Sequence, residues 1–390
     1  GPLMKVAQMV STIPDFLPAE YAAELGQLQA QAPAMGWPFV KRRMRAELGA
    51  DWLSLFDSFQ KEASHAASLG QVHDARMHDG RRVACKLQYP DMSSAVESDV
   101  GQLKAMLGLF NRMDGSIDLT EMVGEVTDRL REELDYGREA KHMALYAGML
   151  ADKDFVQVPE PVPELSTDRL LTMTWLDGER LDAFEGAAQD TRNHIAEMLF
   201  WTWWGPFNGH AVIHGDPHLG NYQVTGGGTG INLLDFGCIR VFPPTFVEGV
   251  VDLYRATLAE DFDAAYAAYE KWGFQNLSRE LVEVLNIWAR FIYGPLLDDR
   301  LRSVADGVSA GEYGRKEAFQ VRRLLKEKGP VKIPREFVFM DRAAIGLGAA
   351  YLRLKEEVNY HRLFEESLEG FDVNAVALRQ ADALKAASLA

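Results

Sequence analysis

The sequence predicts an α+β fold, with a small lobe of strands and helices followed by a larger, mainly helical lobe. Val83–Leu87 is a short alternating segment after the turn-like triplet His78-Asp79-Gly80, as expected for the second strand of a hairpin. The segment from Asn221 to Gly230 contains a glycine run that predicts another tight hairpin turn. Amphipathic stretches fill much of 247–390. A hydrophobic content of 47% over 390 residues is sufficient for a substantial core.

The remaining elements follow from periodicity and from helix-breaking residues. Apolar side chains recur at three- and four-residue steps near the start of the chain, and Pro33 and Pro38 mark the end of that pattern. In order, we expect helices over about 1–60, strands over 64–90, helices over 95–150 with one at about Leu119–Met149, extended chain over 155–178, and mainly helices from 182. The predicted domains are a helical extension over 1–60, a small lobe with inserted helices over 61–178, and a helical lobe over 179–390.

The strongest functional signal lies on both sides of the second hairpin. His214-Gly215-Asp216 begins a loop that ends at Asn221, and Asp235-Phe236-Gly237 follows shortly afterwards. The Asp-x-x-x-x-Asn spacing followed by Asp-Phe-Gly is typical of phosphotransfer sites. Asp216 would lie beside the attacking hydroxyl, while Asn221 and Asp235 would supply the oxygen ligands that Mg²⁺ prefers. We therefore predict a magnesium–nucleotide site.

A transition-metal centre is the alternative for the same loop. His214, Asp216 and His218 carry groups that suit zinc or iron. No third imidazole lies nearby at helical spacing, and the downstream Asp-Phe-Gly would have no role. Phosphotransfer is therefore the favoured interpretation.

A nucleotide site also needs a cation for the phosphates. Lys86 lies in the predicted strand Val83–Leu87 and is the candidate. A carboxylate from the helix at about 119–149 should hold it, although spacing alone does not choose among the acidic residues of 132–139. Before Lys86, where a glycine-rich loop is usual, the chain has Ala66, Ala67 and Ser68. Alanine is less flexible than glycine and keeps its β-carbon, so an ordinary protein kinase is disfavoured.

These residues together resemble the UbiB-like atypical kinases of ubiquinone biosynthesis. The resemblance extends from Lys5 to about Phe371. It rests on Lys5-Val6-Ala7-Gln8 as a Lys-x-Gly-Gln-like motif, on the alanine-rich loop, on Glu133-Leu134-Asp135, and on the His214–Asn221 loop with its Asp-Phe-Gly. The implied fold is protein-kinase-like and two-lobed, with ATP, or ADP in its place, and Mg²⁺ as cofactors. The implied activity is that of an ATPase or small-molecule kinase with weak or no protein kinase activity in trans.

The resemblance also implies roles for single residues. Glu139 would be the carboxylate partner of Lys86. Glu133 and Asp135 would face a regulatory segment that carries Lys5 and Gln8. The adenine ring would lie against a strand and hinge at Leu171–Gly178, which contributes Met173 and Trp175.

Two residues depart from the family pattern. Ala7 stands where the first motif has glycine, and His65 stands where the loop has a small residue. The second departure would bring an imidazole near the phosphates.

Composition limits the partners. A net charge of −16 argues against nucleic acid and against general attraction to anionic membranes, because both rely on neutralising phosphate charge. The basic run Lys41–Arg45 is either a solvated helix face or a local contact with an anionic membrane. Cys85 and Cys238 predict a reducing compartment and buried thiols that would report on the nucleotide site by alkylation.

No run of eighteen apolar residues occurs, so no membrane span is expected. The apolar run Met198–Trp204 is better explained as a buried helix that supports the catalytic loop. Gly1-Pro2 resembles a protease scar, and no targeting peptide is recognised. We expect a cytoplasmic protein with at most peripheral membrane contact. The resemblance to UbiB-like proteins implies a small-molecule or lipid-like acceptor, and quinone-biosynthesis proteins as partners.

Two other functions remain open on the sequence. Aminoglycoside- and choline-kinase-like phosphotransferases share the His-Gly-Asp-x-x-x-x-Asn loop, but not the motifs at Lys5 and Glu133. A nucleotide-gated lipid or protein scaffold would bind ATP and change shape without catalysis.

Overall fold

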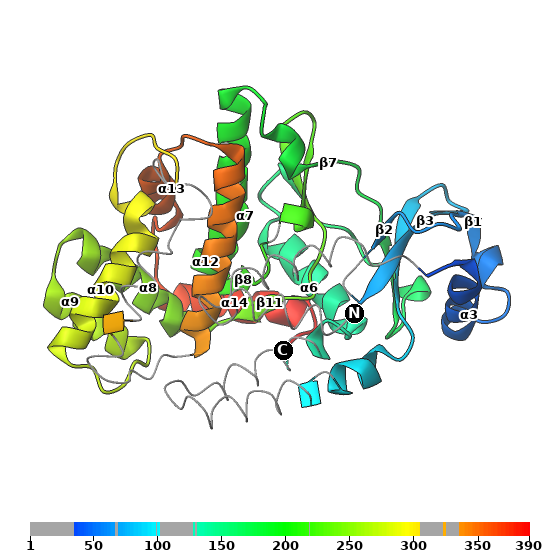
Figure 1. Cartoon of the computed structure of the whole chain (residues 1–390), viewed down its shortest axis with the longest axis horizontal. Helices are drawn as coiled ribbons and strands as arrows, with labels where there is room; N and C mark the ends of the chain where they lie inside the picture. The colour runs from blue at the N-terminus through cyan, green and yellow to red at the C-terminus, as the bar shows by residue number, and fades with distance from the viewer. Residues whose placement is uncertain are drawn as a thin grey trace. The chain divides into compact units, whose positions relative to one another are not determined.

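The computed structural model describes residues 35–66, 69–98, 100–101, 128, 131–217, 219–304, 323–324 and 335–390. They fall into two compact units. The first takes residues up to 144, with 159–176 and 235–238; the second takes 145–158, 177–234 and 239–390. Figure 1 shows helices and sheets mixed in the chain, so the predicted α+β class is confirmed. The domain limits at residues 60 and 178 stay predictions.

The first unit combines a sheet with helices. Its elements are α3 (Trp37–Leu48), the 3₁₀ turn η1 (Trp52–Leu55), β1 (Phe56–Phe59), β2 (His65–Ala66), β3 (Gly70–Met77), β4 (Arg82–Gln88), most of α6 (Tyr136–Met149), η2 (Pro163–Leu165) and β6 (Leu170–Thr174). The strand order is β1-β3-β4-β6, and β2 also pairs with β3.

The predicted strand at Val83–Leu87 is confirmed as the centre of β4. Strand β4 pairs antiparallel with β3 in a hairpin, from Gly70 opposite Gln88 to Arg76 opposite Arg82. Gly80 in the connecting turn has φ +90°, a conformation that glycine adopts without strain. The turn signal in the sequence therefore marked a real reversal of the chain.

Strand β4 separates a hydrophobic core from a polar site by simple alternation. Val83, Cys85 and Leu87 are buried in one cluster with the apolar face of α3. Successive side chains of a strand point to opposite faces. Figure 1 shows α3 beside the sheet. Lys86 therefore lies on the face of β4 that is turned away from α3. The core thus fixes the strand that carries the candidate phosphate lysine.

The expectation of helix through residue 60 was wrong in its last part. Helix α3 ends at Leu48, and Gly49 follows it with φ +93°. Phe56–Phe59 then forms β1 on the edge of the sheet, where Trp52 packs edge-on against Phe59 at 5.1 Å between ring centroids. Pro38 lies in the first turn of α3 and begins that helix, because proline lacks only an N–H that the first turn does not use.

The helix expected at about 119–149 is interrupted in its described part. Arg131 and Glu132 are helical, Glu133 and Leu134 form a turn, and α6 begins at Tyr136. A polar cap explains the break. The carboxylate of Asp135 accepts a hydrogen bond from the backbone N–H of Arg138 at 2.9 Å, which satisfies a donor that a helix start leaves unpaired.

The second unit is mainly helical. Its elements are β5 (Val156–Gln157), β7 (Glu179–Arg180), η3 (Leu181–Phe184), α7 (Gln189–His210), β8 (Val212–His214), η4 (Leu219–Asn221), β9 (Tyr222–Thr225), β10 (Gly230–Leu233), β11 (Ile239–Val241), α8 (Pro244–Leu258), α9 (Phe262–Lys271), α10 (Arg279–Tyr293), η5 (Gly294–Leu297), α12 (Arg335–Leu354), α13 (Tyr360–Ser367) and α14 (Val373–Ala386). Its sheets have the orders β5-β10-β9-β7 and β11-β8.

Two predictions about the second unit are confirmed. Strands β9 and β10 form an antiparallel hairpin, and Gly226, Gly227 and Gly228 in its turn all have positive φ. The apolar run Met198–Trp204 lies in α7 and is largely buried. Trp203 of this helix donates from its indole N–H to the carbonyl of His214 at 3.2 Å. Helix α7 therefore supports the start of the candidate catalytic loop.

Candidate active site

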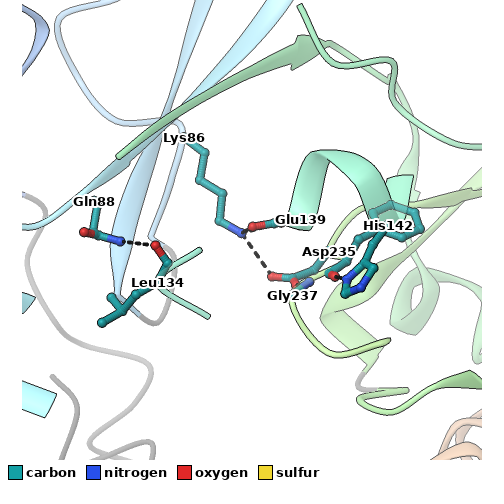
Figure 2. Close-up of polar contacts among 8 residues, drawn as sticks. Lys86, Gln88, Leu134, Glu139, His142, Asp235 and Gly237 are labelled. Carbon is teal, nitrogen blue, oxygen red and sulfur yellow. Dashed lines mark hydrogen bonds and ion pairs between the residues drawn. The ribbon is translucent and has the colours of Figure 1, made fainter. Parts of the chain in front are cut away.

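A buried ammonium between two carboxylates is the centre of the first unit's polar face. Lys86 Nζ donates to both carboxylate oxygens of Glu139, at 2.7 and 2.9 Å, and lies 3.5 Å from Oδ2 of Asp235 (Figure 2). The side chain of Glu139 is 2% exposed and that of Lys86 is 11% exposed. The sheet, α6 and the Asp-Phe-Gly turn therefore each contribute one charged group to a single cluster.

The electrostatics of this cluster follow from burial and charge pairing. Burial by itself lowers the pKa of Lys86, but Asp235 and Glu139 more than offset it, so this pKa stands well above its usual value. Burial raises the pKa of Glu139, and Lys86 lowers it in part. The ring of Tyr136 lies 5.3 Å from Lys86 Nζ and adds a cation–π contact. Lys86 is thus held as a cation.

Asp235 is oriented by its own turn. Its Oδ1 accepts a hydrogen bond from the backbone N–H of Gly237 at 2.9 Å, while Oδ2 faces Lys86. The side chain remains 44% exposed. A carboxylate that is fixed at one oxygen and accessible to solvent is suited to bind a hard cation such as Mg²⁺.

The predicted catalytic loop lies in the second unit. Asn221 donates from its side-chain amide to the carbonyl of Asp216 at 2.8 Å, which directs its amide oxygen elsewhere. The backbone N–H of Asp216 donates to Nδ1 of His214 at 3.3 Å. At the base of the β9–β10 hairpin, the N–H of Leu234 donates to the carbonyl of Asn221 at 3.1 Å. The structure thus places Asp216 with Asn221, and Lys86 with Glu139 and Asp235.

Part of the predicted phosphate loop and regulatory segment lies outside the described residues. This applies to Ala67, Ser68, Lys5 and Gln8. Ala66 is exposed in β2 and pairs with Gln71 of β3. The next glycine, Gly70, has a packing role: a β-carbon there would lie 2.2 Å from the carbonyl oxygen of Leu87, so a side chain would push β3 away from β4.

The predicted adenine-binding segment contains an aromatic stack. Met173 is buried in β6 opposite Ala84 of β4. Trp175 follows that strand, and its ring stacks on His65 at 6.1 Å between centroids with a 24° tilt. The guanidinium of Arg82 lies 4.4 Å from the same ring. The His65 imidazole, expected near phosphates, is therefore placed against the tryptophan of the predicted hinge.

Glu133 and Asp135 occupy the turn before α6. Glu133 lies near Gly237, since a β-carbon on that glycine would be 3.7 Å from Cγ of Glu133. Asp135 is exposed and caps α6, as described above. The predicted contact of both residues with the Lys5–Gln8 segment stays a prediction.

Two substitutions of Asp135 distinguish its role as a helix cap from its predicted regulatory role. Asp135→Ala should lower the free energy of unfolding by about 1 kcal/mol, because a helix start loses its side-chain acceptor. Asp135→Asn keeps an acceptor oxygen and should leave stability near wild type. Chemical denaturation of both variants measures this. Equal stability of Asp135→Ala and wild type would show that the cap contributes nothing, and altered turnover in Asp135→Asn alone would indicate a role for the charge.

Sequence reasoning missed two buried polar residues of this site. Gln88, at the end of β4, donates from its side-chain amide to the carbonyl of Leu134 at 3.1 Å (Figure 2). His142, one turn after Glu139 in α6, bonds the carbonyl of Phe236 at 3.0 Å. The available signal was positional: Gln88 lies two residues after Lys86 on the same strand face, and His142 lies three residues after Glu139 on the same helix face.

The two thiols are buried, as predicted. Cys85 points into the core beneath β4, and burial raises the pKa of its thiol to about 12. Alkylation at Cys85 is therefore a poor probe of the nucleotide site, because the reactive thiolate is scarce and inaccessible.

Among the described residues, no group of three or more His, Cys, Asp or Glu side chains is arranged to hold a metal ion. His218 lies outside the described residues, so a centre of His214, Asp216 and His218 remains a hypothesis. No helix among the described residues combines the length and apolar character needed to cross a membrane.

The basic run Lys41–Arg45 lies on α3. Lys41, Arg42 and Arg45 are exposed. Arg43 is used internally, because it pairs with Glu47 at 3.1 Å and donates to the carbonyl of Gln88 at 3.2 Å. Only part of the run is therefore available to a membrane.

Comparison with known proteins identifies relatives among atypical kinases. The model of the ABC1 atypical kinase-like domain matches residues 27–269. The mitochondrial atypical kinase COQ8 of Saccharomyces cerevisiae is 30% identical over 275 residues, which cover 70% of this chain and 55% of that protein. AarF domain-containing protein kinase 1 of Mus musculus is 31% identical over 291 residues, covering 71% and 54%. The chain spans about half the length of the curated relatives it matches.

A solved structure supports the same conclusion. The Rv3197–erythromycin complex from Mycobacterium tuberculosis is similar with a TM-score of 0.67 and 25% identity, covering 95% of this chain and 93% of that one. The predicted protein-kinase-like fold and the resemblance to UbiB-like proteins are confirmed. The chain belongs to the ABC1 atypical kinase-like family.

Proposed function

We propose that this protein binds Mg–ATP and transfers or hydrolyses its terminal phosphoryl group in support of isoprenoid quinone biosynthesis. The observation that carries the proposal is the Lys86–Glu139–Asp235 cluster. Phosphoryl transfer depends on positioning and on charge neutralisation, and an oriented lysine beside an accessible aspartate supplies both. Membership in an atypical kinase family supports this assignment.

Each group in the cluster has a separate task in this proposal. Lys86 neutralises the non-transferred phosphates, and Glu139 keeps its ammonium directed toward them. Bound magnesium would offset the charge of the phosphate oxygens. Asp235 and Asn221 would hold the ion through carboxylate and amide oxygens, which are suitable hard ligands. Asp216 would orient the acceptor hydroxyl or water and take its proton.

The acceptor in this proposal is water or a small, lipid-like molecule. The resemblance to UbiB-like proteins implies weak or no phosphorylation of other proteins. It also implies quinone-biosynthesis proteins as partners. The exposed basic residues Lys41, Arg42 and Arg45 are the candidates for peripheral contact with an anionic membrane. The net charge of −16 restricts such contact to a local patch.

Phosphate release from Mg–ATP tests this function. The purified chain should release phosphate, faster with vesicles of anionic phospholipid than with vesicles of neutral lipid, and Asp235→Asn should remove the activity. If ATP is bound but neither ADP nor phosphate forms in any condition, a nucleotide-gated scaffold replaces the ATPase. If ADP forms only when a small alcohol or amine is added, and the phosphoryl group is found on that acceptor instead of as free phosphate, a phosphotransferase of the aminoglycoside- or choline-kinase type is favoured.

A further inference from the structure

His142 is a buried histidine with defined partners on both ring nitrogens. Its side chain lies in α6 and is 3% exposed. Nδ1 lies 3.0 Å from the carbonyl oxygen of Phe236, and Nε2 lies 3.5 Å from Nε of Arg138. Figure 2 shows the His142 ring beside Asp235 and Gly237. A carbonyl oxygen only accepts, so Nδ1 carries the proton and donates it. The contact of Nε2 with Nε of Arg138 is consistent with this position of the proton on Nδ1.

The partner of His142 is one end of the peptide group that orients Asp235. The carbonyl of Phe236 and the N–H of Gly237 belong to the same peptide unit. That N–H donates to Oδ1 of Asp235 at 2.9 Å. Because a peptide unit is planar and rigid, a bond that fixes the direction of its carbonyl also fixes the direction of its N–H. The position of the Asp235 carboxylate therefore depends on His142 through one rigid group.

Two side chains of helix α6 form hydrogen bonds with the backbone of the Asp-Phe-Gly turn. Glu139 and His142 are three residues apart and lie on the same helix face. Glu139 accepts a hydrogen bond from the backbone of Phe236, and His142 donates to the carbonyl of that residue. Glu139 also holds Lys86. One face of α6 thus sets both the lysine and the aspartate of the cluster.

We propose that His142 is a positioning residue that holds the Phe236–Gly237 peptide so that Asp235 presents its second oxygen to the nucleotide-bound cation. The inference rests on the proposed function in taking Asp235 as a cation ligand. His142 itself touches neither nucleotide nor metal. It acts as the outer hydrogen bond that orients a ligand, and such bonds influence metal affinity strongly.

Three substitutions test the role of the Nδ1 donor. In His142→Asn the amide nitrogen takes the place of Nδ1 and retains a donor for Phe236. In His142→Gln the amide nitrogen lies near the place of Nε2, so the donor to Phe236 is lost. His142→Ala removes both. The Mg²⁺ concentration that gives half-maximal tightening of fluorescent ADP binding should rise about tenfold in the Gln and Ala variants, and stay within about twofold of wild type in the Asn variant.

Two further measurements make the outcome decisive. ADP affinity in EDTA should be the same in wild type and the Asn and Gln variants, because the effect acts through the cation. Thermal unfolding identifies any variant that fails to fold, and if the Ala variant does, the Asn and Gln pair decides. If wild type and the Gln variant need the same Mg²⁺ concentration for half-maximal tightening of ADP binding, the role of His142 is overturned and the proposed function stays intact. A wild-type protein whose ADP binding ignores Mg²⁺ would overturn both.

Discussion

Lys86→Met is expected to abolish phosphate release and to lower the free energy of unfolding by about 3 kcal/mol or more. The substitution leaves Glu139 buried without its cation, and breaking one side of a buried ion pair is far more costly than removing both. Turnover also falls, because the substitution removes the fixed positive charge that faces the phosphates. Phosphate release and urea denaturation measure the two effects separately.

The destabilisation of Lys86→Met should depend on pH in a defined direction. Burial already raises the pKa of Glu139, and loss of Lys86 removes a group that lowers it. The folded state then holds a proton more tightly than the unfolded state, so stability falls as pH rises above the usual glutamate value through the folded pKa. The free energy of unfolding that Lys86→Met removes should therefore be larger at pH 8 than at pH 5.

A double substitution is the control for this mechanism. Lys86→Met combined with Glu139→Gln removes both charges, so it should recover much of the stability and lose the pH dependence, while phosphate release stays absent. If Lys86→Met is as stable as wild type at pH 8, the ion pair is not a structural requirement and the buried-charge argument is wrong.

Asp235→Asn should eliminate the effect of Mg²⁺ on nucleotide binding while leaving the fold intact. The amide is a weaker cation ligand than the carboxylate, and it cannot neutralise charge. The side chain is 44% exposed, so the change should alter the melting temperature by only a few degrees. Titration calorimetry of ADP, with Mg²⁺ and with EDTA, measures the difference in affinity that the metal contributes.

Asp79→Asn is a matched control for this experiment. Asp79 belongs to the same unit, its side chain is 47% exposed, and it pairs with Arg81 in the β3–β4 turn, away from the cluster. It should behave as wild type with respect to Mg²⁺. An Asp235→Asn protein whose ADP affinity still increases with Mg²⁺ as in wild type would contradict the assignment of Asp235 as a metal ligand.

Local patterns were enough to predict strand β4 and both hairpins. Alternation together with a glycine turn located β4, and a glycine run located the β9–β10 turn. These features depend on neighbours in the sequence, which is why they could be predicted. The family pattern suggested Glu139 as the partner of Lys86, a choice that spacing alone left open, and the structure places these two side chains in contact.

Other features depend on contacts between distant segments. The start of α6 was missed because the acidic run 132–139 continues a helical composition, and only the hydrogen bond to Asp135 shows where the helix begins. His142 was missed because its partner, Phe236, is 94 residues away. The edge strand β1 was assigned to helix, since its phenylalanines acquire their role only by packing on Trp52.

The tip of the β9–β10 hairpin is exposed, whereas its base is fixed by strand pairing. Gly226 and Gly227 are exposed at the tip, whereas pairing from Thr225–Gly230 to Tyr222–Leu233 fixes the register down to Asn221 at the base. A few residues added between the two exposed glycines would lengthen the loop without shifting that register, and the entropic cost of a longer loop grows slowly. The tip is therefore a suitable attachment point for a fluorescent reporter, close along the chain to the candidate catalytic loop and separated from it by the paired strands.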